Sequence, residues 1–290
     1  YHNMHWCEAR DLVRKWREEN VRKSQELVDI WEQVLKNKAH KLGDEQYLVL
    51  EQVCIAALDC HRLEVAGKCL QQLSYNFPGS LRIRSLQALH FEAIERYDEA
   101  LEFLDSIIKR DETNPAPRKG KFAIFKARGR IQDAIKELTE YLKKFMIDQE
   151  AWQELSELYL SEQDYSKAAF CMEELILHNP HNHLFHQRLA DIKYTQGGYD
   201  NLELAKSYYC QAIKLNPMNM RALYGIVLTC YNIIASQKCT SSKKKEANNL
   251  ITWALKRIHE RYRESNVEDN QVTAIENLMS SLQINSATNL

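Results

Sequence analysis

Four histidines lie close together in the sequence, in a pattern that could bind a metal ion. They are His178, His181, His183 and His186. Neutral imidazole is a common zinc ligand, but zinc sites place their ligands at regular spacings, often with cysteine. Here the histidines flank Asn179-Pro180 and the start of a predicted helix, and no cysteine or carboxylate stands at a familiar ligand spacing. We therefore expect polar turn residues here and predict no metal ion.

Sequence patterns typical of enzymes are missing from the chain. It contains no Gly-x-x-x-x-Gly-Lys loop for phosphate, no Gly-x-Ser-x-Gly turn for a nucleophile and no His-Glu-x-x-His pair for zinc. The one glycine pair, Gly197-Gly198, is explained by a turn. The sequence therefore predicts a non-catalytic protein without a cofactor.

Charged residues remain as groups that could recognise a partner. The stretch from Pro115 to Arg130 contains no acid but six basic residues: Arg118, Lys119, Lys121, Lys126, Arg128 and Arg130. The stretch that follows is rich in acids: Glu150, Glu154, Glu157 and Glu162. Exposed ion pairs contribute only about 0–1 kcal/mol each, so such charges steer a partner more than they hold it. We predict that Arg118, Lys119, Lys126, Glu150 and Glu157 bind a partner, with a solvated charged face as the alternative.

A 34-residue period positions these charges. Ala66, Ala100, Ala134 and Ala168 are each 34 residues apart, and Ala205 follows after 37. Large apolar residues stand three positions before, four after and seven after each of the first four alanines. Small residues let two helices approach closely, and this period with these offsets is typical of the tetratricopeptide repeat. An ordinary helical bundle with accidental self-similarity is the alternative.

The clearest single repeat runs from Gln149 to Pro180. Trp152 and Leu155 fall on one face of its first helix, Asp164-Tyr165 mark the turn, and Ala168 begins the second helix. First helices line the concave face of such a solenoid, so we expect its groove to change from positive to negative along the chain. Helix pairs cannot bury their apolar faces alone, and stacking gives them a continuous core.

These signals predict an all-α tetratricopeptide repeat superhelix, or α-solenoid, with N- and C-terminal capping helices. Only 8 glycines and 5 prolines occur in 290 residues, which leaves little material for hairpins. We expect an arm and capping helices in residues 1–44, with residues 1–10 poorly ordered, and repeats in residues 45–235. Residues 236–290 should form a Lys-rich loop around Lys243–Lys245 and C-terminal helices. The last of these is marked by an apolar stripe: Val272, Ile275, Leu278, Met279 and Leu282.

Composition excludes several classes of protein. The formal net charge of -1 argues against a general nucleic-acid binder. No apolar run reaches the roughly 20 residues needed to span a membrane. The chain has eight cysteines and no Cys-x-x-Cys pair, and several stand at apolar helix positions: Cys54, Cys69, Cys171, Cys210 and Cys230. Such cysteines indicate small core residues and a reducing compartment.

One known binding mode of these repeats is excluded by the sequence. Some tetratricopeptide proteins hold chaperone tails in a clamp of Lys and Asn on successive first helices. The corresponding positions here hold Glu51 and Ile55, Ser85 and Leu89, and Lys119 and Ala123. The clamp is absent, which argues against a co-chaperone.

Short strings outside the repeat consensus resemble a known family. They are Lys15-Trp16-Arg17-Glu18-Glu19-Asn20, Phe77-Pro78-Gly79-Ser80, Asp148-Gln149-Glu150-Ala151-Trp152, Lys167-Ala168-Ala169-Phe170-Cys171, Asn179-Pro180-His181-Asn182-His183 and Lys193-Tyr194-Thr195-Gln196-Gly197-Gly198. These strings resemble the subunit 2 family of the endoplasmic reticulum membrane protein complex. The likeness covers about Lys15 to Leu223 and includes no known binding motif, so it assigns no contact residue.

The resemblance implies a scaffold subunit on the cytosolic face of the endoplasmic reticulum membrane. Such a subunit is peripheral and associates with the membrane indirectly, while the complex inserts tail-anchored and multi-spanning proteins. Its expected partners are cytosolic parts of subunits 3 and 5 and the cytosolic subunit 8 or 9, with no nucleic acid. A free cytosolic adaptor or co-chaperone that binds peptides in its groove is the alternative.

Overall fold

The computed structural model describes residues 4–264, 273–274, 277 and 280–281. All regular elements within these residues are helices, which confirms the all-α class. The chain forms two compact units, residues 1–141 and residues 142–290, and each is described by itself. The boundary falls inside α8, Ile131–Lys144, within the region predicted to hold repeats.

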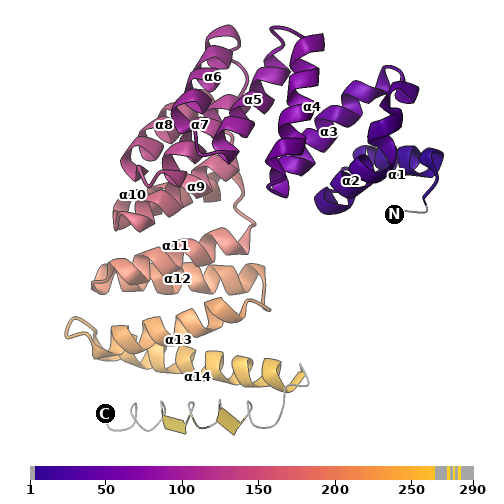
Figure 1. Ribbon diagram of the computed structural model, residues 1–290. Coiled ribbons are helices and arrows are strands. Elements are labelled where there is room, and N and C mark those ends of the chain that lie inside the picture. Colours follow the sequence, from indigo (N-terminus) through magenta and orange to yellow (C-terminus); the bar gives the residue numbers. More distant parts are fainter. Residues whose placement is uncertain (1–3, 265–272, 275–276, 278–279, 282–290) are drawn as a thin grey trace. The chain divides into compact units, whose positions relative to one another are not determined.

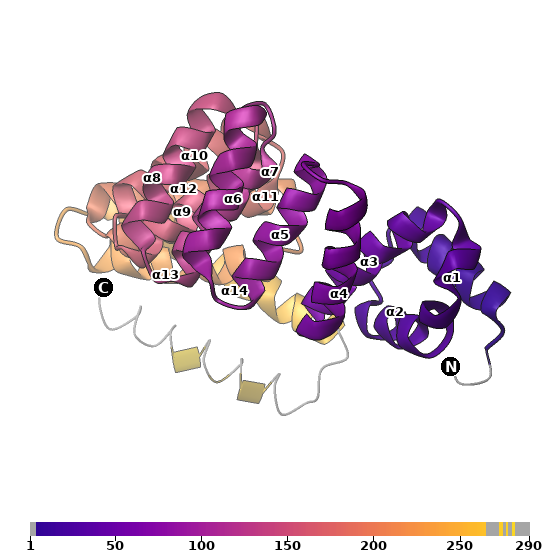
Figure 2. The same cartoon turned by 45° about the horizontal axis from the view of Figure 1, so that its top comes forward.

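The first unit begins with capping helices and continues with helix pairs (Figures 1 and 2). The capping region contains α1 (Trp6–Glu18) and α2 (Ser24–Ile30), then a π-helical turn (Trp31–Leu35) and a 3-10 helix (Lys36–Leu42). The pairs follow: α3 (Glu45–Asp59) with α4 (Leu63–Asn76), α5 (Leu81–Ala93) with α6 (Tyr97–Arg110), and α7 (Ala116–Ala127), which leads into α8.

The prediction of a poorly ordered arm is wrong for residues 6–10, which belong to α1. His5 caps this helix: its side chain accepts a hydrogen bond from the Cys7 backbone N–H, and the Glu8 carboxylate accepts one from the His5 N–H. This reciprocal arrangement satisfies two N–H groups that a helix start leaves open. Ala9 and Val13 are fully buried beneath it, so the helix is also held by the core.

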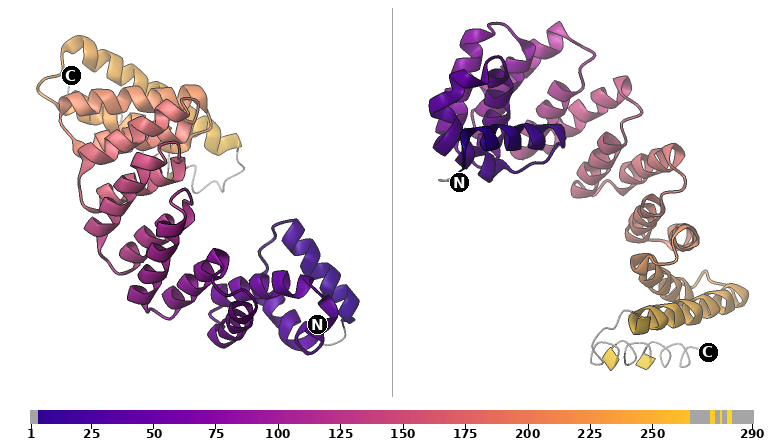
Figure 3. Two further views of the ribbon diagram at one scale, coloured as in Figure 1. Left: turned by 90° about the horizontal axis from the view of Figure 1, so that it is seen from above. Right: turned by 90° about the vertical axis from the view of Figure 1, so that its right-hand side faces the viewer.

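The second unit contains three complete helix pairs, whose members lie side by side in chain order (Figures 1 and 3). They are α9 (Gln149–Ser161) with α10 (Tyr165–His178), α11 (His183–Gln196) with α12 (Tyr199–Leu215), and α13 (Met220–Ala235) with α14 (Ser241–Glu264). Asp148, Asp164, Asn182 and Asn219 cap four of these helices by accepting backbone hydrogen bonds in the first turn.

The five alanines of the 34-residue period are fully buried. Ala66, Ala100, Ala134 and Ala168 are each the fourth residue of a second helix, α4, α6, α8 and α10. Ala205 is the seventh residue of α12, because Gly197 and Gly198 lengthen the preceding turn. The period therefore marks equivalent sites within each unit, where a larger side chain would have no space.

The turn inside each repeat also recurs every 34 residues. His61, Glu95, Gly129 and Gln163 all have a left-handed backbone, with φ between 56° and 70°. The next residue donates its N–H to a carbonyl five positions back, as Arg96 does to Phe91 at 2.8 Å. This pattern closes the end of a helix, and it favours glycine because a Cβ is strained at positive φ.

The Lys-rich run is not a loop. Helix α14 begins at Ser241, so Lys243–Lys245 lie in its first turns and the loop spans only residues 236–240. The lysines have partners on α12, since Lys243 Nζ lies 3.7 Å from a Glu203 carboxylate oxygen and over the Tyr199 ring. The predicted last helix, with Val272, Ile275, Leu278, Met279 and Leu282, has its apolar stripe outside the described residues.

The cysteines are free thiols rather than a disulfide framework. Cys54, Cys69, Cys171 and Cys230 are buried, and Cys210 is partly buried. Burial raises the pKa of the Cys54 thiol to about 11, so this group stays protonated at neutral pH. These side chains pack as small apolar residues, which fits the role expected of them.

Candidate partner-binding surface

Half of the basic stretch on α7 and in the following turn joins helices within the first unit. Lys121 Nζ lies 3.0 Å from Asp105 Oδ1 on α6 and 3.3 Å from Glu137 Oε1 on α8. Burial lowers the pKa of Lys121, but the two carboxylates outweigh it and leave the pKa above its usual range. Arg128 pairs with Asp98 at 2.9 Å, and Arg130 with Asp133 at 2.7 Å. These charges are therefore shared between helices.

The three basic residues predicted to bind a partner differ in their exposure. Arg118 and Lys119 are partly buried, whereas Lys126 is exposed. The Lys119 ammonium lies 6.0 Å from the centroid of the Tyr141 ring, within range of a cation–π contact. Lys126 is the one of the three that presents its charge most openly.

The predicted acidic residues lie on α9, in the second unit. Glu150 and Glu157 are exposed. The Glu157 carboxylate accepts a 2.6 Å hydrogen bond from Arg188 on α11, so it joins neighbouring first helices. The basic and acidic groups belong to different units, and a change of sign along one groove stays a prediction.

An apolar hollow lies on the first helices of the first unit. Its centre is formed by Ile55 on α3 and Leu89 on α5, which stand 34 residues apart and are 36% and 46% exposed. The hollow has a volume of about 330 Å³, and its other lining residues are Arg22, Leu58, Asp59, Glu92, Ala93 and Tyr97. Exposed apolar side chains gathered in a hollow mark a place for a partner's side chain.

Two carboxylates on the rim of this hollow differ in their surroundings. Asp59 accepts hydrogen bonds from Arg22 at 2.6 and 2.8 Å and from the Ser24 hydroxyl at 2.7 Å, which hold its pKa below the usual range. Glu92 has no salt-bridge or hydrogen-bond partner among the described side chains, and burial raises its pKa. The hollow therefore suits a partner segment that places a cation or N–H donor beside an apolar side chain.

The clamp positions show what the sequence reasoning missed. Ile55 and Leu89 served only to exclude a Lys-Asn clamp, yet they form the centre of the hollow. The signal that could have found them is their spacing: both are large apolar residues at the same position of successive first helices. In a helix whose opposite face is already buried, such a pair indicates an outward anchor.

Comparison with known proteins assigns the chain to a family. A model described as the EMC2 TPR-like repeat domain matches residues 70–201, and a tetratricopeptide repeat model matches residues 187–219. ER membrane protein complex subunit 2-A of Xenopus laevis is 49% identical over 283 residues, which cover 96% of this chain and 95% of that protein. The chain belongs to the family of ER membrane protein complex subunit 2. This confirms the resemblance that the short strings indicated.

More distant proteins share the subunit 2 sequence or the repeat fold. ER membrane protein complex subunit 2 of Dictyostelium discoideum is 33% identical over 265 residues, which cover 87% of this chain and 81% of that protein. The crystal structure of the C-terminal part of a TPR repeat-containing protein from Cytophaga hutchinsonii matches with a TM-score of 0.62 at 13% identity. That match covers 93% of this chain and 99% of the solved one, and it supports the fold alone.

The histidines of this subunit 2 family member hold turns together. The two ring nitrogens of His183 each lie 3.0 Å from a side-chain amide nitrogen, one of Asn216 and one of Asn219. His186 Nε2 lies 2.8 Å from the Pro180 carbonyl oxygen. In the part of the chain that the structure describes, no group of three or more His, Cys, Asp or Glu could hold a metal ion. His183 thus links two successive inter-repeat turns.

Trp152 anchors the start of α9 by a polar and an apolar contact. Its indole Nε1 donates a 2.8 Å hydrogen bond to the Met146 carbonyl, and its ring meets Phe170 of α10 edge-on with centroids 6.2 Å apart. The residue is partly buried, so it fixes the entry of the chain into this repeat. Among the described helices of this family member, none is both long and apolar enough to cross a membrane.

Proposed function

We propose that this chain is a non-catalytic scaffold subunit of the ER membrane protein complex. Its family membership, at 49% identity over 96% of the chain, carries the proposal. The subunit is peripheral on the cytosolic face of the endoplasmic reticulum membrane, and it supports insertion of tail-anchored and multi-spanning proteins by holding other subunits in place. The repeat fold supports this role, because stacked helix pairs offer long surfaces for other chains.

The hollow on α3 and α5 is the proposed anchor for one of these subunits. Affinity in protein interfaces comes mainly from a few buried apolar side chains, and Ile55 and Leu89 are available for burial. The charges of Arg118, Lys119, Lys126, Glu150 and Glu157 would guide the approach of partners. The expected partners are the cytosolic parts of subunits 3 and 5 and the cytosolic subunit 8 or 9.

Affinity purification tests this role. The tagged full chain is purified from membranes in mild detergent, and the co-purified proteins are quantified by mass spectrometry. Replacing Ile55 and Leu89 together by Gln should reduce recovery of at least one complex subunit several-fold, because two apolar anchors are lost.

Tyr75 supplies the matched control, since it is an exposed large residue of the same unit outside the hollow. Tyr75→Gln should leave recovery unchanged, and thermal melts should show that all variants fold. Equal recovery from the double variant and the parent would overturn the anchor. Recovery of soluble cytosolic proteins in place of membrane-complex subunits would instead favour a free adaptor.

A further inference from the structure

The turns between successive repeats of the second unit lie along one edge. Helix direction alternates along the chain, so the turns 145–148, 179–182 and 216–219 share an edge, and α14 ends there too. Figure 1 shows the last three of these features on the right-hand side of the second unit. The turns inside the repeats, at residues 162–164, 197–198 and 236–240, occupy the opposite edge.

This inter-repeat edge presents large apolar side chains to solvent. Ile147 is 81% exposed and Leu177 is 76% exposed. Met146, Met218 and Leu184 at the same edge are each more than half exposed. The opposite turns show no large exposed hydrophobic residue among the described ones, and they are rich in Ser, Gln and Gly. Packing of the unit does not require this difference, since both edges close the same helix pairs.

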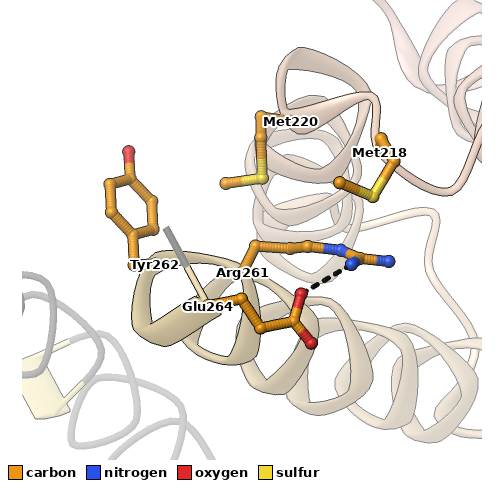
Figure 4. A pocket seen from close by; sticks show the side chains of 5 residues that line it. All are labelled: Met218, Met220, Arg261, Tyr262 and Glu264. Atoms are coloured by element: carbon orange, nitrogen blue, oxygen red, sulfur yellow. Dashed lines mark hydrogen bonds and ion pairs between the residues drawn. The ribbon is translucent and has the colours of Figure 1, made fainter. Parts of the chain in front are cut away.

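Basic side chains accompany the apolar ones. Lys143 and Lys144 end α8, Lys214 precedes the end of α12, and Arg263 lies in the last turn of α14. The edge also holds an apolar hollow of about 400 Å³, in which Met218 and Met220 face the Arg261–Glu264 ion pair (Figure 4). Exposed apolar tips interleaved with lysines are typical of surfaces that enter the headgroup region of a membrane.

We propose that the inter-repeat edge of the second unit contacts an anionic lipid surface directly. The side chains of Ile147, Leu177 and Met218 enter the boundary between headgroups and acyl chains, and the lysines lie among the phosphates. A docked protein would need one contiguous patch, whereas here the apolar tips are separated by the width of a helix pair. A membrane accepts such separated insertions. This contact goes beyond the proposed function, in which other subunits carry the link to the membrane.

Vesicle flotation with the purified full chain tests the proposal without any other subunit. Vesicles of phosphatidylcholine with phosphatidylserine should carry the chain, and vesicles of phosphatidylcholine alone should carry much less. Replacing Ile147 and Leu177 together by Ser should lower the lipid partition coefficient about tenfold or more, because two inserted side chains are lost. The matched control replaces Leu204 and Leu228 by Ser, since both are exposed in the same unit away from this edge, and it should float like the parent.

A second pair of variants tests the charges. Lys144→Glu with Lys214→Glu should abolish the preference for anionic vesicles, whereas Lys238→Glu with Lys245→Glu on the opposite side should leave it intact. Melting temperatures identify any variant that unfolds. The proposal is overturned if the parent fails to float, or if the Ile147/Leu177 variant floats like the parent. Loss of a co-purified subunit in that variant, with flotation unchanged, would assign the edge to a protein partner.

Discussion

Backbone strain at the turn inside each repeat should be measurable in the first unit. Glu95 and Gly129 occupy the same turn position in successive repeats, with φ of 60° and 70°. The Glu95 side chain is exposed and makes no hydrogen bond or ion pair within the described part of the chain. Glu95→Gly therefore changes little except the backbone preference.

The expected magnitude follows from two opposing effects. A left-handed backbone costs an L-residue about 1–2 kcal/mol, and glycine removes that cost. Glycine also gains roughly 0.5–1 kcal/mol of conformational freedom in the unfolded chain, which offsets part of the benefit. Glu95→Gly should thus raise the free energy of unfolding by about 0.5–1 kcal/mol. Gly129→Ala should lower it by a similar amount, since the space around Gly129 is open and only the backbone is strained.

Urea denaturation of the full chain provides the assay. The first unit's transition should shift upward for Glu95→Gly and downward for Gly129→Ala, with slopes unchanged. Glu95→Ala is the control, because it removes the side chain and keeps the strained backbone, so it should match the parent. The reasoning is refuted if Glu95→Gly is no more stable than Glu95→Ala, or if Gly129→Ala equals the parent.

Three further substitutions test packing and charge. Gly225→Ala should destabilise by about 1–3 kcal/mol in urea melts, because its Cβ would lie 2.4 Å from the Tyr209 ring; Gly67→Ala, with open space, should cost nothing. Ala168→Leu should cost a similar amount at a fully buried site, and an unchanged melting temperature would contradict the helix-pair packing. Hydrogen bonds from Arg14 lower the pKa of Glu45 from 4.5 to about 2, so their stabilisation is complete above pH 4.5 and lost as pH falls toward 2. Glu45→Gln should therefore unfold more easily than the parent at neutral pH and equally easily at the acid limit, as thermal melts across this range would show.

Much of the fold was predictable because the helix pairs repeat one packing problem. A helix crossing that leaves no space for a side chain demands a small residue, and the 34-residue spacing of Ala66, Ala100, Ala134 and Ala168 exposes that demand in the sequence. The start of α1 was missed because His5 is an uncommon cap. Lys243–Lys245 were assigned to a loop because a run of like charge disfavours an isolated helix, whereas here Glu203 of α12 offsets it.

The candidate surface was less predictable than the fold. A run of basic residues does not reveal which of them already have acidic partners, and Lys121 pairs with carboxylates on both neighbouring second helices. Ile55 and Leu89 look like core residues when read one at a time. Their exposure depends on which face of α3 and α5 is covered, and only the arrangement of the helices determines that.

Fractionation of cells that make the full chain at its native level tests the scaffold role most directly. We expect the chain to sediment with endoplasmic reticulum membranes, to be released by alkaline carbonate, and to migrate in mild detergent as part of an assembly much larger than its own 34.0 kDa. A free 34.0 kDa species found entirely in the cytosolic fraction would contradict the account.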